Sequence, residues 1–147
     1  MESDPIICYL IINDSLGMSI GKTAAQTAHA SQYLMLKFFD LKEKSSEIKR
    51  MMNIIKNDNE DLLKQYKDIA SQISIMSEWL NTSVTKVVLK ADSKEFLKLK
   101  EEFKAEMVLV TDAGRTEIPS GSETVICLWP RRKSTCSKTI KRLQLLK

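Results

Sequence analysis

An uninterrupted apolar run near the start of the chain constrains the fold more than any other feature. Residues Ile6 to Ile12 read IICYLII, seven apolar side chains in a row. Because side chains of a β-strand point alternately to the two faces of a sheet, a strand without polar residues must be covered on both faces. The run is also much shorter than the roughly 20 residues of a membrane-spanning helix. We therefore predict a central strand that is buried from both sides.

Strand-like and helix-like segments alternate along the rest of the chain, which is typical of an α/β domain. Three further strands are predicted, at Thr85–Ala91, Glu106–Thr111 and Thr124–Trp129. Helices are predicted at about Gly21–Leu41, Asp92–Lys104 and Ser134–Leu145. With 147 residues and no internal repeat, the chain is expected to form one domain over 1–147.

The segment from Asp40 to Leu80 interrupts this alternation. It reads as one or two further helices, because apolar residues recur at helical spacing on both sides of Asn57–Asn59. That polar triplet breaks the pattern and could cap the second helix. We expect an inserted helical hairpin over about 40–80 that packs on the domain. Its outward faces could bind a protein partner.

The cysteine and histidine content limits the kinds of site. Cys8, Cys127 and Cys136 have no paired spacing, so free thiols in a reducing compartment are predicted, and with them a cytoplasmic location. His29 is the only histidine, so the chain lacks the ligands of a zinc site. We expect no metal and no membrane segment.

Basic residues are concentrated at the C-terminal end. Seven of the residues from Arg131 to Lys147 are Lys or Arg and none is acidic, although the whole chain has a net charge of only +4. Such a cluster is expected of a protein that binds a polyanion such as a nucleic acid. A solvated helix face is the alternative interpretation.

A Gly-Lys-Thr sequence follows the first predicted strand, as in a nucleotide-binding loop. That loop requires four residues between its first glycine and its Gly-Lys pair. Gly17 and Gly21 enclose only three. The spacing therefore argues against nucleotide binding and leaves Lys22 to be explained.

The first predicted helix carries a stripe of polar and aromatic residues at helical spacing: Lys22, Gln26, His29 and Tyr33. Ala25, Ala28 and Leu36 are then expected to face the sheet. A cation in the first turn of a helix opposes the helix dipole by about 0.3–1 kcal/mol, so Lys22 is a candidate anion anchor. A solvent-exposed lysine without function, and a histidine merely packed on the helix, are the alternatives.

Asp112 closes the third predicted strand. Ligands of α/β sheets bind beyond the carboxyl ends of parallel strands, where the first helix also begins. If the first and third strands are parallel neighbours, Lys22 and Asp112 meet at one edge of the sheet. An amine and a carboxylate there could orient a water and stabilise charge at a carbonyl under attack. The alternative is a structural turn in which the aspartate bonds backbone amides.

Two motifs carry a resemblance to a known family. GKTAAQTAHA (Gly21–Ala30) and TDAGRTEIPSGSETVICLWP (Thr111–Pro130) together resemble the archaeal and eukaryotic type of peptidyl-tRNA hydrolase. The segment from Trp79 and the ending RLQLLK are similar to further parts of the same family. The resemblance implies a three-layer α/β/α sandwich with a four-stranded mixed sheet. It also implies cleavage of the ester between a peptide and its tRNA without a metal or cofactor; some relatives are dimers.

The resemblance also assigns candidate residues. It implies a functional lysine and aspartate with two threonines near them: Lys22, Asp112, Thr116 and Thr124. It implies substrate contacts from the helix stripe and the DAGR segment: Gln26, His29 and Arg115. Basic residues that could contact tRNA phosphates follow the last strand: Arg131, Arg132 and Lys133.

The chain departs from the usual residues of this family at four positions: Asn13, Ser15, Ile20 and Glu117. Its segment between His29 and Trp79 is also longer than in most relatives. These departures keep a second hypothesis open, a family member that binds protein or RNA without catalysis.

Overall fold

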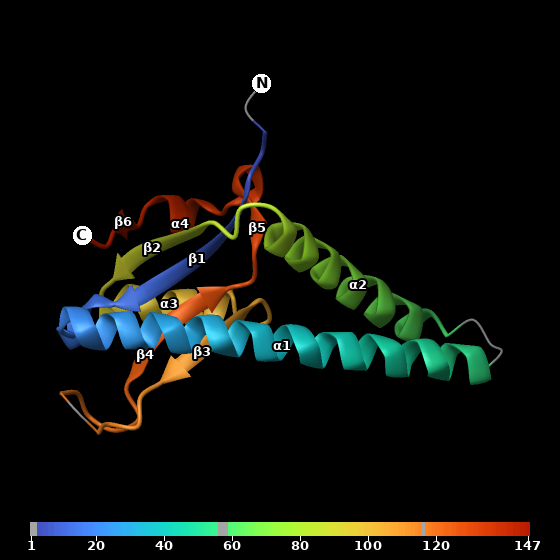
Figure 1. Cartoon of the computed structure of the whole chain (residues 1–147), viewed down its shortest axis with the longest axis horizontal. Coiled ribbons are helices and arrows are strands. Elements are labelled where there is room, and N and C mark those ends of the chain that lie inside the picture. The colour runs from blue at the N-terminus through green and yellow to red at the C-terminus, as the bar shows by residue number, and fades with distance from the viewer. Residues whose placement is uncertain (1–2, 56–58, 116) are drawn as a thin grey trace.

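The apolar segment near the N-terminus forms the middle strand of a mixed sheet (Figure 1). The computed structural model describes residues 3–55, 59–115 and 117–147. Its strands are β1 (Ile6–Asn13), β2 (Lys86–Ala91), β3 (Met107–Thr111), β4 (Glu123–Leu128), β5 (Arg131–Arg132) and β6 (Gln144–Leu145). Its α-helices are α1 (Ile20–Ile54), α2 (Glu60–Asn81), α3 (Ser93–Glu102) and α4 (Lys138–Lys141), with 3-10 turns η1 (Asp14–Leu16) and η2 (Lys133–Thr135).

The sheet has six strands instead of the four that the resemblance implies. Its order is β3-β4-β1-β2-β6, and β5 pairs with β1 outside this path. Strands β1 and β2 are parallel, and every other pair is antiparallel. The two additional strands have two residues each, which is too short for any periodicity to show in the sequence.

Every residue of β1 is buried, as its unbroken apolar run predicts. Its residues at positions 6, 8, 10 and 12 belong to a core that α1 and α2 complete with Leu34, Phe38, Met76 and Trp79. Its residues at positions 7, 9 and 11 belong to a second core, which contains Phe96 of α3. Helical side chains therefore pack against both faces of this strand.

The predicted free thiols are confirmed. Cys8, Cys127 and Cys136 are all unpaired and buried. Cys8 on β1 and Cys127 on β4 lie in the same core with 3.5 Å between their sulfur atoms. They act as small apolar side chains in the sheet.

The first helix is much longer than predicted. The structure has a single helix over Ile20–Ile54, because no glycine or proline interrupts the sequence after Leu41. The second helix begins after Asn59, whose side chain accepts the backbone N–H of Leu62 at 3.1 Å and caps it as predicted. The other two residues of the predicted break, 57 and 58, lie outside the described residues. The two helices form a hairpin that extends beyond the sheet (Figure 1).

The face of α1 that packs on the sheet also differs from the prediction. Ala25, Ala28 and Leu36 are exposed. The buried row lies on an adjacent face of the helix and comprises Gln26, Ala30, Leu34, Phe38, Leu41 and Ile48. The buried row thus includes a polar residue, Gln26, whose side-chain amide has hydrogen-bond partners inside the fold.

The predicted C-terminal helix is wrong. Only the single turn Lys138–Lys141 is α-helical, after the 3-10 turn η2, and Gln144–Leu145 then pairs antiparallel with β2. Without this pairing β2 would be an edge strand with unpaired backbone groups, so a short strand is favoured over another helical turn. No helix in the described parts of the chain is long and apolar enough to cross a membrane.

The sheet-proximal half of the hairpin is part of the core, which predicts a clear stability difference between two methionines. Met76 on α2 is fully buried, whereas Met51 on α1 is 47% exposed. Met76→Ala should lower the free energy of unfolding by about 2–5 kcal/mol through the cavity it leaves. Met51→Ala should change it by less than about 0.5 kcal/mol. Urea unfolding measures both, and equal effects would contradict the packing described here.

Candidate active site

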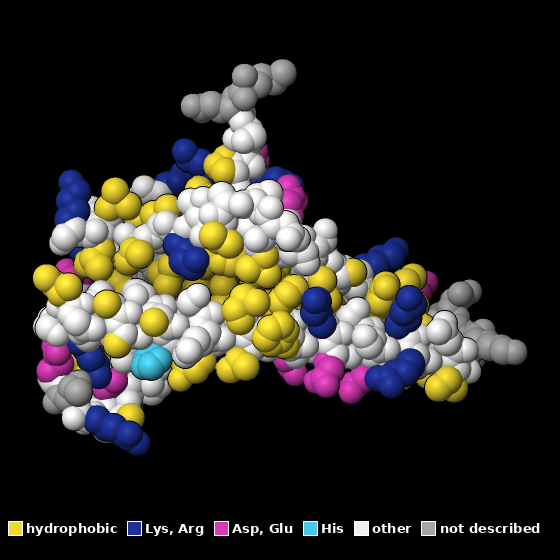
Figure 2. Space-filling view, viewed as in Figure 1, with side chains coloured by type: hydrophobic (Ala, Val, Ile, Leu, Met, Phe, Trp, Pro, Cys, Tyr) yellow, Lys and Arg dark blue, Asp and Glu magenta, His cyan; other side chains and the backbone are white. Residues whose placement is uncertain are grey.

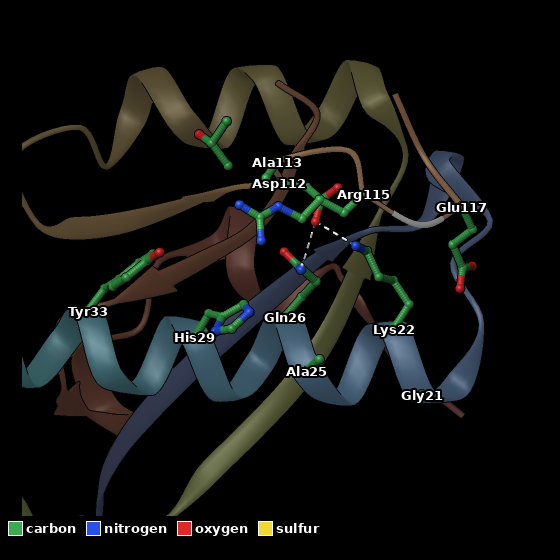
Figure 3. A pocket seen from close by; sticks show the side chains of 11 residues that line it. Gly21, Lys22, Ala25, Gln26, His29, Tyr33, Asp112, Ala113, Arg115 and Glu117 are labelled. Carbon is green, nitrogen blue, oxygen red and sulfur yellow. Dashed lines mark hydrogen bonds and ion pairs between the residues drawn. The ribbon is translucent and has the colours of Figure 1, made fainter. Parts of the chain in front are cut away.

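The N-terminus of α1 lies just beyond the carboxyl end of β1. Ser19 caps the helix, because its hydroxyl oxygen accepts the backbone N–H of Lys22 at 3.2 Å. Lys22 therefore lies in the first helical turn, as predicted. From this turn its side chain extends toward the end of β3, where Asp112 follows Thr111 (Figure 3).

Lys22 and Asp112 form an ion pair between segments ninety residues apart in the chain. Nζ of Lys22 lies 2.5 Å from Oδ1 of Asp112, and both side chains are at most 10% exposed. The strand arrangement differs in one respect from the prediction. Strands β1 and β3 do run in the same direction, but β4 lies between them. The length of the lysine side chain spans this separation.

Asp112 has two further donors. The side-chain amide of Gln26 donates to Oδ1 at 3.1 Å, and the backbone N–H of Gly114 donates to Oδ2 at 2.6 Å. The structural turn considered from the sequence is therefore present together with the ion pair. These donors, with the Lys22 ammonium first among them, lower the pKa of Asp112, and burial of the carboxylate opposes this shift without reversing it. The carboxylate is ionised at neutral pH.

Thr124 supports this arrangement through a hydrogen bond to Gln26. It is fully buried on β4, and its hydroxyl donates to Oε1 of Gln26 at 2.6 Å. This bond fixes the orientation of the Gln26 amide, which leaves its N–H group directed at Asp112 (Figure 3). Thr124 thus acts through Gln26 and does not line the pocket. Thr116, the other predicted threonine, lies outside the described residues.

An open pocket of about 510 Å³ surrounds the ion pair. The helix α1 contributes Lys22, Gln26, His29 and Tyr33 to its lining, so the predicted stripe faces one space. The segment after β3 contributes Asp112, Arg115 and Glu117. Figure 2 shows the histidine at the surface, with acidic and basic side chains close by.

Glu117 connects the loop after β3 to the start of α1 by hydrogen bonds. Its two carboxylate oxygens accept the backbone N–H of Ser19 at 2.7 Å and the Ser19 hydroxyl at 2.6 Å. These two bonds lower the pKa of Glu117. A negative charge at this end of a helix is also favourable for the helix dipole. The acidic residue at this position, noted above as a departure, therefore has a local structural role.

Gly114 allows the same loop to turn back on itself. Its φ is +71°, and a Cβ built there would lie 2.4 Å from the backbone nitrogen of Ser120. Only glycine fits such a close approach. The glycine of the DAGR segment thus provides the space for the loop as well as a hydrogen bond to the catalytic candidate Asp112.

The other three departures are also accommodated locally. Asn13 is buried, and its side-chain amide donates to the carbonyl of Glu123 at 3.1 Å. The Ser15 hydroxyl accepts the backbone N–H of Ser93 at 2.9 Å, which joins η1 to the start of α3. Ile20 is 92% exposed and lies outside the pocket lining. None of the three disturbs the ion pair.

The basic residues predicted to contact tRNA lie elsewhere. Arg131 and Arg132 pair with the first two residues of β1, so they lie at the opposite end of that strand from the pocket. Arg131 forms an ion pair with Glu106 at 3.5 Å, and Arg132 forms one with Glu78 at 2.8 Å. Lys133 follows in η2. The structure does not bring these three together with Lys22 and Asp112.

Sequence reasoning missed Ser19 and Tyr33 as parts of the site. The position of Ser19 directly before the helix was the signal for its capping role. Tyr33 belongs to the predicted stripe, but its sequence position alone assigns it no contact with the substrate. Among the described residues, no group of three or more His, Cys, Asp or Glu side chains could hold a metal ion.

A carboxylate held ionised beside an ammonium group, in an open pocket at the end of an α/β sheet, is an arrangement suited to hydrolysis of an ester. Comparison with known proteins agrees. The sequence model of the family Peptidyl-tRNA hydrolase PTH2 matches residues 6–146. The chain belongs to this family, which confirms the resemblance seen in the sequence.

Individual relatives match over most of the chain. A "Peptidyl-tRNA hydrolase" of Methanococcus maripaludis is 33% identical over 141 residues, covering 93% of this chain and 96% of the relative. One of Methanopyrus kandleri is 30% identical, covering 94% and 96%. A "Probable peptidyl-tRNA hydrolase 2" of Dictyostelium discoideum is 32% identical and covers 92% of this chain. The chain spans about half, 52%, of that last relative.

The ion pair predicts how the titration of Asp112 depends on Lys22. Lys22→Met should raise the pKa of Asp112 toward its ordinary value of 3.8, because the largest stabilising partner of the carboxylate is lost. Carboxyl-carbon NMR titration measures this pKa. Lys100→Met, which removes a different ion pair, should leave it unchanged.

The sign of the pH effect on stability follows from the same shift. Since the pKa of Asp112 is lower in the folded chain than its ordinary value of 3.8, its stabilising contribution is present above that value and is lost as the pH falls through the folded pKa. In the NMR titration, an Asp112 pKa that is the same in Lys22→Met as in wild type would show that Lys22 has no electrostatic effect on the carboxylate.

Proposed function

We propose that this chain hydrolyses the ester that joins a peptide to the terminal ribose of tRNA. The names of its relatives support the substrate, and the Lys22–Asp112 pair in an open pocket is the observation that carries the chemistry. The assembled site gives no support to the alternative of a non-catalytic binding module.

In this proposal Asp112 positions the attacking water. A carboxylate offers about four acceptor positions, and three donors already occupy three of them. Oδ2, which accepts only the Gly114 N–H among the described residues, has room for a water proton. The low pKa of Asp112 makes it a weak base, so orientation of the water is its main contribution.

Lys22 stabilises the negative charge that develops on the ester carbonyl. Its ammonium group has three N–H donors, and the contact with Asp112 uses one. The others can reach the carbonyl oxygen as water adds to its carbon. The water proton passes by way of Asp112 to the ribose oxygen, which leaves as a hydroxyl when the intermediate collapses. No step requires a metal ion.

Other residues position this pair or bind the substrate. Gln26 and Thr124 hold Asp112 in place, and Arg115 in the pocket lining is suited to a phosphate near the ester. Because Arg131, Arg132 and Lys133 lie away from the pocket, they would contact a part of the tRNA that is distant from the ester. Roles for Thr116, a homodimer, a protein partner of the helical hairpin and a cytoplasmic location remain predictions of the sequence.

Helices that contribute to cores on both sides of β1 support a three-layer α/β/α arrangement for this domain. In such an arrangement the reacting groups meet at the end of the sheet. The hairpin then extends away from the pocket and leaves it accessible to a tRNA end.

The test is hydrolysis of N-acetyl-leucyl-tRNA by the purified chain. Lys22→Ala and Asp112→Asn should each lower kcat by about 10²–10³-fold, the usual effect of removing one preorganised polar group. Lys100→Ala is the matched control, because it removes a lysine paired with Glu123 at 3.0 Å outside the pocket. It should retain the wild-type rate within about twofold. Hydrolysis by wild type no faster than by the Lys22→Ala, Asp112→Ala double variant would contradict the proposal.

A second test concerns metal ions. Because the proposed steps use only side chains of the protein and water, incubation with EDTA followed by removal of the chelator should leave kcat unchanged. Magnesium is then added to the EDTA-treated and the untreated sample alike, to stabilise the tRNA. A loss of rate that zinc or manganese restores, but magnesium does not, would show that a metal ion takes part.

A further inference from the structure

Two aromatic rings lie side by side at one end of the pocket. His29 and Tyr33 are one helical turn apart on α1, with 6.4 Å between ring centres and 18° between ring planes. Both side chains are exposed, Tyr33 to 41%, and both belong to the pocket lining (Figure 3). The mechanism above assigns neither ring a role. The pair therefore presents flat, nearly parallel aromatic surface in the same pocket as Lys22 and Asp112.

The surroundings of these rings are cationic and polar. The Arg115 guanidinium extends from the opposite wall of the pocket toward Gln26 and His29 (Figure 3). Arg115 has no ion-pair partner among the described residues. A flat ring surface beside an uncompensated cation is the combination that binds an unpaired nucleotide, through base stacking and phosphate contact.

The spacing along the helix fits one particular base. His29 is seven residues beyond Lys22 and Tyr33 eleven, which corresponds to about 10 and 16 Å along the helix axis. In the substrate, the base of the terminal nucleotide is attached to the same ribose as the ester. Gln26, which also donates to Asp112, lies three residues before His29 and seven before Tyr33, about 4 and 10 Å along the axis, so a base on the ribose of an ester beside Asp112 is within reach of the rings.

We propose that His29 and Tyr33 form a stacking surface for the base of the 3′-terminal nucleotide of tRNA. This inference rests on the proposed function and adds a binding subsite to it. An apolar side chain of the peptide fits this surface less well, because such groups favour enclosed apolar pockets, and this one is open and carries Lys22, Asp112 and Arg115. Tyr33 supplies the larger ring and is the residue to test.

The probe is a short RNA that ends in adenosine and carries N-acetyl-leucine on its 3′ carbon through an amide, which the enzyme cannot cleave as an ester. Fluorescence anisotropy gives its affinity. Tyr33→Ala should weaken binding by about 5- to 100-fold, since stacking on one aromatic ring has this effect. Tyr33→Phe keeps the ring and should bind within about twofold of wild type. Leu36→Ala, at an exposed position outside the pocket lining, should bind as wild type.

A second probe lacks the terminal base but is otherwise identical. Wild type and Tyr33→Ala should bind this abasic probe equally, because the proposed partner of the ring is absent. The proposal is overturned if Tyr33→Ala weakens both probes by the same factor. It is also overturned if the effect of Tyr33→Ala disappears when acetyl-leucine is replaced by acetyl-glycine, which would assign the ring to the peptide.

These measurements separate the subsite from the catalytic proposal. Binding of the uncleavable probe does not depend on turnover. Base-dependent binding through Tyr33 by a chain that fails to hydrolyse N-acetyl-leucyl-tRNA would support the subsite and contradict the hydrolase. Normal hydrolysis with no difference between the two probes would do the reverse.

Discussion

The ion pair between Lys22 and Asp112 is the contact on which the site depends. It joins the first turn of α1 to the end of β3. The strand that leads into α1 is β1, and β1 and β3 are not neighbours in the sheet. The register of β4 between β1 and β3 sets the separation that the lysine side chain must span. The pairing of β3 with β4 ends at Thr111, after an irregularity between Val110 and Thr111, and Asp112 follows directly. The chemistry of the pocket is thus fixed by the packing of the sheet.

Buried polar groups beneath the pair give this site its rigidity. Gln26 occupies a position on the buried face of α1 that an apolar residue would ordinarily fill, and both ends of its amide have partners. None of the buried side-chain polar atoms of the described residues lacks a hydrogen bond. Because an unpaired polar group in the core costs roughly 1–3 kcal/mol, Thr124, Gln26 and Asp112 hold one another in a single arrangement.

The departures from the usual family residues show how local contacts can keep such a site intact. Glu117 places a negative charge near a pocket proposed to accept a polyanion, but both of its oxygens are occupied by Ser19 at the positive end of α1. Its charge is therefore partly balanced where it lies. The helix α1 begins beside Ser19, covers the sheet with its buried face, and continues into the helical hairpin.

The sequence by itself determined the buried central strand, the free thiols, the capping role of Asn59, and Lys22 and Asp112 as the candidate pair, because apolar runs, capping residues and short motifs act locally. It did not determine the continuous α1, the buried face that includes Gln26, the two-residue strands β5 and β6, or the separation of Arg131 from the pocket. Those features depend on which segments become neighbours. Only the tertiary structure decided them, since pairing of strand edges and burial of polar groups are satisfied by partners far away in the chain.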